Sequence, residues 1–312
     1  MTAGKEAETM TNYQVEEHTG KLLPCEGAPG CGLCWLSPEE FLALEGDHPY
    51  RQPLSRSLGA IRYCKLDVFK DCLQGTLKIP AKGAQHTGAL TFGFYIHGGR
   101  LLLVGSEAAR AKLPAQLPRS LPAHASPTLL FLALLEAFME DDLLYLQEIE
   151  GRLAGIEDKL LERMSQPLYR AILSERKRLS AFHAYYEQMV DLGDEMQAYL
   201  TGLQAAEECA AWQFYTRRTE RLHNHVETLR EDLLQIRELY QSQLDVQQNK
   251  VMTFLTVVTT LFLPLTLIAG WYGMNFPTMA AFHWKYGYLA VVCVSVLIIV
   301  AELIYFKKKK ML

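Results

Sequence analysis

The chain has 312 residues, which leaves room for roughly two domains. Its formal net charge of −4 lacks the basic excess of a nucleic-acid-binding protein, so we expect neither DNA nor RNA as a partner. Seven cysteines are an odd number, and this favours reduced thiols in a cytosolic compartment over a disulfide framework. The polar, acidic start has no secretory signal, so we expect the N-terminus to stay inside the cell.

Residues 1–127 have the short, punctuated pattern of a cytosolic α/β domain. Runs typical of β-strands at Leu90–Ile96 and Leu101–Val104 are separated by the turn residues Gly98-Gly99. The segment Ser37-Pro38-Glu39-Glu40 combines a capping serine, a proline at the first helical position and two acids in the first turn. It therefore predicts the start of a helix.

Three cysteines lie near one another in this first domain: Cys25, Cys31 and Cys34. They contain a single CxxC pair, and Cys34 falls on a predicted strand. A zinc or redox site and a set of plain thiols both remain open from this pattern.

Residues 128–250 predict a stalk of long helices, because they are rich in Leu, Glu, Gln, Ala and Arg. Pro167, with Ser165 as a cap, predicts a boundary between two helices, and Gly202 predicts the next turn. No proline or glycine follows between Ala205 and Leu263, so we expect one helix to continue from the stalk into the next region.

The last stalk helix carries apolar residues at alternating spacings of four and three, the a/d pattern of a coiled-coil seam. The stripe consists of Leu222, Val226, Leu229, Leu233, Ile236 and Tyr240. Packing against the preceding helical hairpin and packing around an oligomer axis both satisfy this pattern.

Residues 251–312 contain two apolar spans. Val251–Gly270 is uncharged, and as a helix it measures about 30 Å, the thickness of a bilayer core. Tyr286–Phe306 is also long enough to cross, and Lys307–Lys310 follow it. Most basic residues near the spans lie before the first span and after the second, and basic residues are retained on the cytoplasmic side. Both termini are therefore expected in the cytoplasm of a multi-pass protein of the inner or plasma membrane. We expect the lysines to meet anionic lipid.

One face of the first span collects its polar, small or flexible residues. They are Asn249, Met252, Thr256, Thr259, Leu263, Thr266 and Gly270. This face suits a pore lining, and it equally suits ordinary packing between membrane helices, where threonine and glycine are enriched. A chain with two spans cannot enclose a conduit, so a pore requires several copies around it.

The segment Gly273-Met274-Asn275 ends the first span and predicts an ion-selective mouth. Pro264 removes a backbone hydrogen bond, and Gly270 and Gly273 loosen the helix end. Backbone carbonyls and the Asn275 amide oxygen are then expected to face a cation. Neutral oxygens bind hydrated Mg²⁺ through water and still release it.

The motifs of this region resemble the CorA-type magnesium channels over residues 220–312, and more weakly upstream at residues 34–41 and 62–80. The motifs are Asn249–Met252, Leu255-Thr256, Phe262–Thr266, Ile268–Gly270, Tyr272–Pro277 and Tyr305–Lys310.

The resemblance implies a homopentameric funnel, with the first membrane helix lining the pore and the second outside it. By resemblance, the pathway residues are Gly273, Met274 and Asn275 as the outer filter, Asn249 as an inner ring, and Met252, Leu255 and Leu263 as a hydrophobic gate. Thr266 lies on the same pore-lining face. Met274 in the middle filter position favours magnesium over the zinc-transporting branch.

Two features depart from the family pattern. The outer loop 276–282 holds no acidic residue, so recruitment of cations by charge does not carry over. Counting back without gaps, Phe214 falls where a relative can hold a stalk carboxylate for a regulatory metal between subunits. Feedback closure does not carry over either, although Glu238 keeps an acid in the stalk.

The sequence therefore predicts an α+β membrane protein with a cytosolic α/β domain, a long helical stalk and two transmembrane helices per subunit. We expect passive Mg²⁺ import, with Co²⁺ and Ni²⁺ as further ions and without catalysis or a cofactor. The membrane potential supplies about 4.6 kcal/mol per 100 mV for a divalent ion, and no Gly-x4-Gly-Lys loop is present. A zinc-transporting or magnesium-exporting relative and a nonconducting, membrane-anchored coiled-coil sensor are the alternatives.

Overall fold

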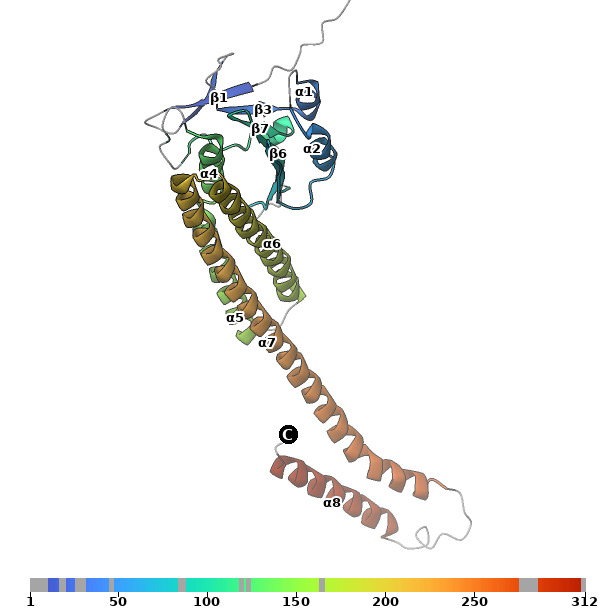
Figure 1. Ribbon diagram of the computed structural model, residues 1–312. Coiled ribbons are helices and arrows are strands. Elements are labelled where there is room, and N and C mark those ends of the chain that lie inside the picture. The colour runs from blue at the N-terminus through green and yellow to red at the C-terminus, as the bar shows by residue number, and fades with distance from the viewer. Residues whose placement is uncertain are drawn as a thin grey trace, which may run out of the picture. The chain divides into compact units, whose positions relative to one another are not determined.

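The computed structural model (Figure 1) divides the chain into two compact units, Met1–Ile236 and Arg237–Leu312. The described residues are 11–16, 21–25, 32–44, 48–83, 88–117, 121, 125–162, 166–274 and 286–309. The first unit holds a sheet and most of the helices, and the second holds two long apolar segments.

The sheet has seven strands in the order β2-β1-β3-β7-β6-β5-β4. Neighbouring strands are antiparallel except for β3 and β7, which are parallel. The strands are β1 Thr11–Val15, β2 Leu22–Cys25, β3 Leu33–Leu36, β4 Lys65–Val68, β5 Leu73–Ile79, β6 Leu90–His97 and β7 Arg100–Val104. The predicted hairpin is confirmed: His97 pairs with Arg100, and Gly98-Gly99 form the turn.

Four short helices accompany the sheet: α1 Pro38–Ala43, α2 Arg51–Leu58, α3 Glu107–Arg110 and α4 Pro127–Phe138. The predicted start of α1 is confirmed as a capping box. The Ser37 amide donates to Glu40 Oε2 at 2.7 Å, and the Glu40 amide donates to Ser37 Oγ at 3.2 Å. Two amides that the helix itself leaves unpaired are thereby satisfied.

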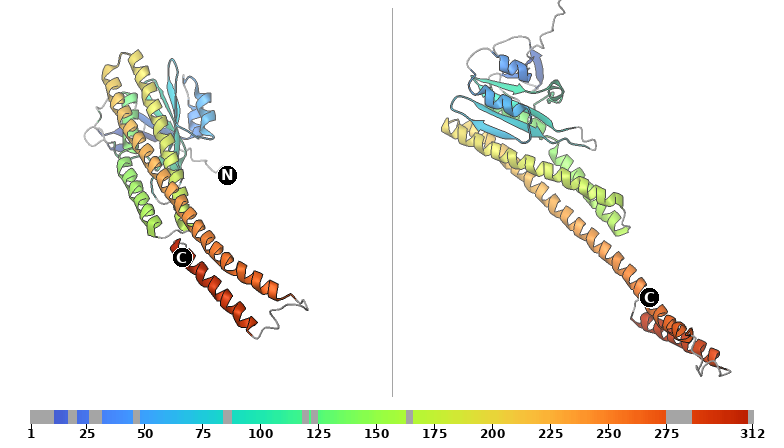
Figure 2. Two further views of the ribbon diagram at one scale, coloured as in Figure 1. Left: turned by 90° about the horizontal axis from the view of Figure 1, so that it is seen from below. Right: turned by 90° about the vertical axis from the view of Figure 1, so that its right-hand side faces the viewer.

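Helices cover both faces of the sheet (Figures 1 and 2), because successive side chains of a strand point to opposite faces. On β6, Tyr95 packs against Phe41 of α1, with ring centroids 5.5 Å apart. Its neighbour Phe94 packs against Phe131 of α4 at 4.3 Å. The apolar run of β6 is therefore buried on both sides.

Three long helices follow: α5 Asp142–Glu162, α6 Gln166–Gly202 and α7 Ala206–Tyr272. The end of α6 at Gly202 and the unbroken α7, which continues through Pro264, confirm the predictions for this region. The predicted cap Ser165 lies outside the described residues.

The apolar stripe of α7 is buried within one chain as far as Ile236. Its members Leu222, Val226, Leu229, Leu233 and Ile236 are each less than 9% exposed. Of the two kinds of packing that the spacing allowed, intramolecular packing therefore accounts for these residues. Tyr240, in the second unit, is half-buried.

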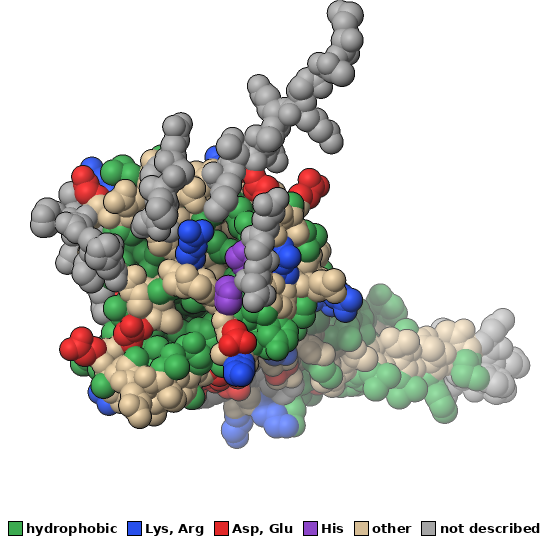
Figure 3. All heavy atoms as spheres, turned by 45° about the horizontal axis from the view of Figure 1, so that its top comes forward, with side chains coloured by type: hydrophobic (Ala, Val, Ile, Leu, Met, Phe, Trp, Pro, Cys, Tyr) green, Lys and Arg blue, Asp and Glu red, His purple; other side chains and the backbone are tan. Residues whose placement is uncertain are grey.

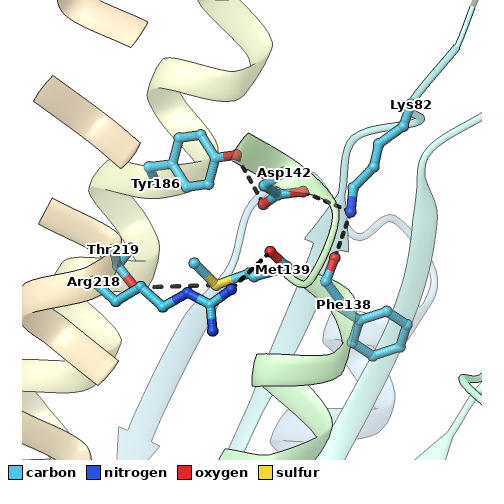
Figure 4. A network of polar contacts seen from close by, with 7 residues as sticks. All are labelled: Lys82, Phe138, Met139, Asp142, Tyr186, Arg218 and Thr219. Carbon is cyan, nitrogen blue, oxygen red and sulfur yellow. Dashed lines mark hydrogen bonds and ion pairs between the residues drawn. The ribbon is translucent and has the colours of Figure 1, made fainter. Parts of the chain in front are cut away.

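A polar network fastens the sheet side of the first unit to its helices (Figure 4). The carboxylate of Asp142, 1% exposed at the start of α5, pairs with Lys82 Nζ at 2.6 Å and accepts a hydrogen bond from the Tyr186 hydroxyl at 2.8 Å. Lys82 also donates to the Phe138 carbonyl at 2.7 Å, and Arg218 of α7 donates to the Met139 carbonyl at 3.5 Å. One buried charge thus links the segment after β5 to α4, α5 and α6.

Candidate functional site

Two helices are long and apolar enough to cross a membrane, by length and composition: α7 and α8 Gly287–Lys308. Their most apolar windows have mean hydropathies of 2.1 and 2.7, and only 6% of each window is buried within the chain. In Figure 3, the part of the molecule that extends to the right shows hydrophobic and uncharged surface among its described residues, and the charged side chains lie over the rest of the view. Apolar surface of this extent requires lipid or neighbouring chains around it.

The predicted pore face of α7 is exposed along its whole length in the single chain. Its residues Asn249, Met252, Thr256, Thr259, Leu263, Thr266 and Gly270 are all exposed. The buried or half-buried residues of the same segment lie on another face, at 253, 257, 258, 260, 261, 264, 265 and 268. Helix α8 lies beside the end of α7 in every view (Figures 1 and 2). Because the residues of the predicted face are exposed, α8 does not cover that face.

Each threonine hydroxyl on this face donates its proton to a backbone carbonyl of the same helix. Thr256 donates to the Met252 carbonyl at 2.8 Å, Thr259 to the Leu255 carbonyl at 2.7 Å, and Thr266 to the Phe262 carbonyl at 2.7 Å. Because each proton is used within the helix, the lone pairs of the oxygen are left as acceptors. The face therefore presents oxygen acceptors suited to a hydrated cation.

The end of α7 places the first two residues of the predicted filter. The helix passes through Gly270 and ends at Tyr272, directly before Gly273. The Gly273 amide donates to the Ala269 carbonyl at 2.8 Å, and a Cβ atom at Gly273 would lie only 2.9 Å from that oxygen. Met274 is exposed, and Asn275 lies outside the described residues. The filter assignment stays a prediction.

The three apolar residues assigned to a gate are not covered by their own chain. Met252 is 60% exposed and Leu263 is 68% exposed, and Leu255 is exposed as well. By contrast, Val257 on the other side of the helix is 6% exposed. Contact with α8 therefore does not explain the bulky side chains at Met252 and Leu263.

The lysines after the second span are placed as far as Lys309. Lys307 and Lys308 occupy the last turn of α8, where positive charge is favourable at a helix C-terminus. The ammonium of Lys309 lies over the Tyr305 ring, 5.4 Å from its centroid. Lys310 lies outside the described residues.

Of the three cysteines singled out in the first domain, Cys34 is described as a buried free thiol. Asn12 of β1 pairs with Cys25 on one side and Cys34 on the other, which places the two backbones two strand spacings apart, about 9.6 Å. Burial raises the pKa of the Cys34 thiol to about 12, so the metal-binding thiolate is disfavoured. No described group of three or more His, Cys, Asp or Glu residues is arranged to hold a metal ion. Cys31 lies outside the described residues.

The stalk position assigned by resemblance to a regulatory carboxylate carries an exposed apolar ring. Phe214 is 65% exposed on α7, and a phenyl group offers no ligand to a divalent ion. The acid lower in the same helix, Glu238, is also exposed.

Comparison with known proteins places these features in a family. The family described as "CorA-like Mg2+ transporter protein" matches residues 63–308. The cobalt/magnesium transport protein CorA of Thermotoga maritima is 30% identical over 183 residues, which cover 59% of this chain and 52% of that protein. The magnesium transport protein CorA of Wolinella succinogenes is 46% identical over 77 residues, 25% of this chain and 24% of that protein. The chain thus spans about half or less of the length of these relatives.

Solved structures show the same fold. The CorA magnesium transporter from Methanocaldococcus jannaschii superposes with a TM-score of 0.73 at 21% identity, covering 96% of this chain and 98% of the other. The full-length CmaX protein gives a TM-score of 0.67 at 14% identity, covering 96% and 99%. The family match extends from just before β4 to the end of α8 and covers more than half of the chain. The chain therefore belongs to the CorA-like Mg²⁺ transporter family.

Proposed function

We propose that this protein is a homopentameric channel for passive, potential-driven import of Mg²⁺, with Co²⁺ and Ni²⁺ as further ions. The observation that carries the proposal is the exposed face of α7, on which Asn249, Thr256, Thr259 and Thr266 present oxygen acceptors within an otherwise apolar helix. Polar groups that face hydrocarbon are costly, so this face requires water or a partner.

Several copies arranged around one axis meet that requirement, because each then turns its open face inward. A hydrated Mg²⁺ would meet the oxygens through its own water, which suits an ion that gives up water reluctantly. In this proposal Gly273, Met274 and Asn275 form the neutral outer filter. Met252, Leu255 and Leu263 form apolar constrictions that close the pore at rest.

The proposed orientation puts both termini in the cytoplasm of an inner or plasma membrane. The lysines at the end of α8 support it, since basic residues are retained on the cytoplasmic side and attract anionic lipid. The proposed division is a cytosolic α/β domain at 1–127, a helical stalk at 128–250 and a pore domain at 251–312. The inside-negative potential then draws the ion inward without a cofactor.

The filter proposal is tested by removing one ligand from each subunit. Asn275→Ala in liposomes under an imposed potential should abolish most Mg²⁺ flux while the oligomer mass stays that of a pentamer, because a ring of amide oxygens is lost. Asn224→Ala, an exposed asparagine of α7 in the first unit, is the matched control and should keep its flux.

The same assay separates the alternatives. Unchanged Mg²⁺ flux in Asn275→Ala would refute the filter. Flux of Zn²⁺ in place of Mg²⁺, or Mg²⁺ flux only outward, would favour the zinc-transporting or exporting relative. No divalent flux from the unsubstituted protein would favour the nonconducting sensor.

A further inference from the structure

A pocket of about 390 Å³ lies in the first unit, between α6 and the residues that flank the segment joining β5 to β6. Its lining combines basic side chains with apolar ones, and its described lining residues include neither Asp nor Glu. The basic residues are Arg62, Lys78, Lys177 and Arg178. The pocket therefore concentrates positive charge in a protein whose net charge is negative.

Three of these cations are not neutralised by their surroundings. Arg62, Lys78 and Lys177 are exposed, and none of them forms an ion pair with another described residue. They come from different parts of the chain: Lys78 from β5, Lys177 from α6 and Arg62 from the segment before β4. The fold, and not a local run of basic sequence, brings them to one pocket.

The fourth cation, Arg178, has a side chain that is only 9% exposed. Its Nε lies 3.8 Å from the carboxylate of Glu175, which already accepts a hydrogen bond from Arg152 at 3.0 Å. One carboxylate is therefore shared between two arginines, and positive charge remains on this side of the pocket.

Tyr185 also lines the pocket, but it is only 3% exposed and its hydroxyl is buried. It therefore shapes the wall of the pocket and is not counted as a hydrogen-bond donor to a ligand.

The combination of charge and size selects the ligand class. Three cations without an ion pair, and Arg178 beside them, favour a multiply charged anion, and arginine forks match phosphoryl oxygens. The volume lies in the range of small-molecule sites, and Pro80 and Ala181 supply apolar surface for an organic part. We propose that this pocket binds a phosphorylated organic anion of nucleotide size.

The test is calorimetric titration of the full-length protein in detergent, in Mg²⁺-free buffer, with ATP as the probe. Adenosine and inorganic tripolyphosphate are titrated separately, to divide the contribution of the organic part from that of the phosphoryl groups. We expect ATP to bind more tightly than either, and its affinity to fall as salt is raised, because exposed charges are screened.

The double variant Lys78→Ala/Lys177→Ala should weaken ATP binding by about tenfold or more, since hydrogen bonds to charged groups are lost. The matched control is Arg170→Ala/Arg176→Ala, which removes two exposed cations of α6 that do not line the pocket. It should leave ATP affinity nearly unchanged.

Four results would overturn the proposal: no heat at millimolar ATP, tripolyphosphate binding as tightly as ATP, equal losses in the double variant and its control, or dissociation of the oligomer by Lys78→Ala/Lys177→Ala. The last would identify the basic patch as a contact between subunits. Because calorimetry reads binding and not flux, failure of the channel proposal and failure of this proposal are distinguishable.

Discussion

At the scale of single residues, the buried carboxylate of Asp142 holds the first unit together through partners that are far apart in the chain. Lys82 neutralises it from the segment after β5, and Tyr186 donates to it from α6. A buried charge is stable only while it is paired, because removal of its partner leaves a charge in a medium that solvates it poorly. The ion pair therefore makes the position of α5 depend on that of Lys82.

Replacing Lys82 with methionine should lower the free energy of unfolding by about 3–5 kcal/mol, the cost of stranding a buried charge. Adding Asp142→Asn to that variant should recover much of the loss, because the carboxamide removes the charge and still accepts from Tyr186. Thermal unfolding of the full-length protein checks both. Lys112→Met is the control, since Lys112 is exposed and its ammonium forms no ion pair with a described residue. Equal midpoints for Lys82→Met and Lys112→Met would contradict the role given to the pair.

The difference between Ser37 and Asp142 shows which residue-scale features can be predicted from sequence. The capping box was predictable because its serine, proline and glutamates lie within four residues and act on each other's backbone. Lys82 and Asp142 meet only because the sheet and the helices fold together, and no spacing signals that contact. The basic pocket was missed for the same reason, since Lys78 and Lys177 are brought together only by the fold.

At the scale of elements, α6 and α7 approach closely at Gly193. A Cβ atom at Gly193 would lie 2.3 Å from Thr216 Oγ1 of α7. That hydroxyl cannot easily move, because it donates to the Trp212 carbonyl at 3.1 Å and accepts from Gln197 Nε2 at 2.8 Å. A glycine within a helix is otherwise unfavourable, so its presence here is explained by the contact.

We expect Gly193→Ala to destabilise the protein by about 1–2 kcal/mol, because an overpacking cost of about 1–3 kcal/mol outweighs the better helix propensity of alanine. Adding Thr216→Ala should relieve the clash and restore part of the stability, a coupling that unrelated sites do not show. Gly151→Ala on α5 is the matched control. Nothing lies within 4 Å of its added Cβ, so it should stabilise by up to about 1 kcal/mol. A lower unfolding midpoint for both single variants would contradict this account.

The element predictions held where one strong local signal decided the outcome. Gly202 ended α6, and the long stretch without proline or glycine gave an unbroken α7. Helix α7 continues through Gly270 to Tyr272, because a single glycine lowers helix stability without ending a helix whose backbone hydrogen bonds continue. The seam of α7 had two possible partners from its spacing, since periodicity identifies a buried face and not what buries it.

At the scale of the whole molecule, the family and the fold could be predicted because the motifs of residues 220–312 resemble a known family. The candidate spans could be predicted because a membrane helix requires a long apolar run. The order of the sheet could not, since β3 pairs with β7 over a long separation and in parallel. The number of subunits is likewise decided by contacts between copies and stays a prediction. Substitutions on the exposed face of α7 test whether that face forms contacts between copies or lines a pore.

If Met252 and Leu263 form a gate, replacing either with a polar residue should make the closed pore leak. A ring of polar side chains lets water enter a constriction that apolar side chains keep dry. Met252→Asn and Leu263→Ser should raise resting Mg²⁺ leak into liposomes while the oligomer mass is unchanged, with the stronger effect at Met252, beside Asn249. Both residues are more than half exposed in the single chain, so the substitutions remove little packing within it. Val257→Asn is the matched control. Val257 is 6% exposed, and burying an amide there should lower the unfolding midpoint and the oligomer yield instead.

Flux is compared at matched oligomer yield. Reduced flux with normal assembly in Met252→Asn would contradict the gate, and equal loss of oligomer in all three variants would make these residues packing contacts.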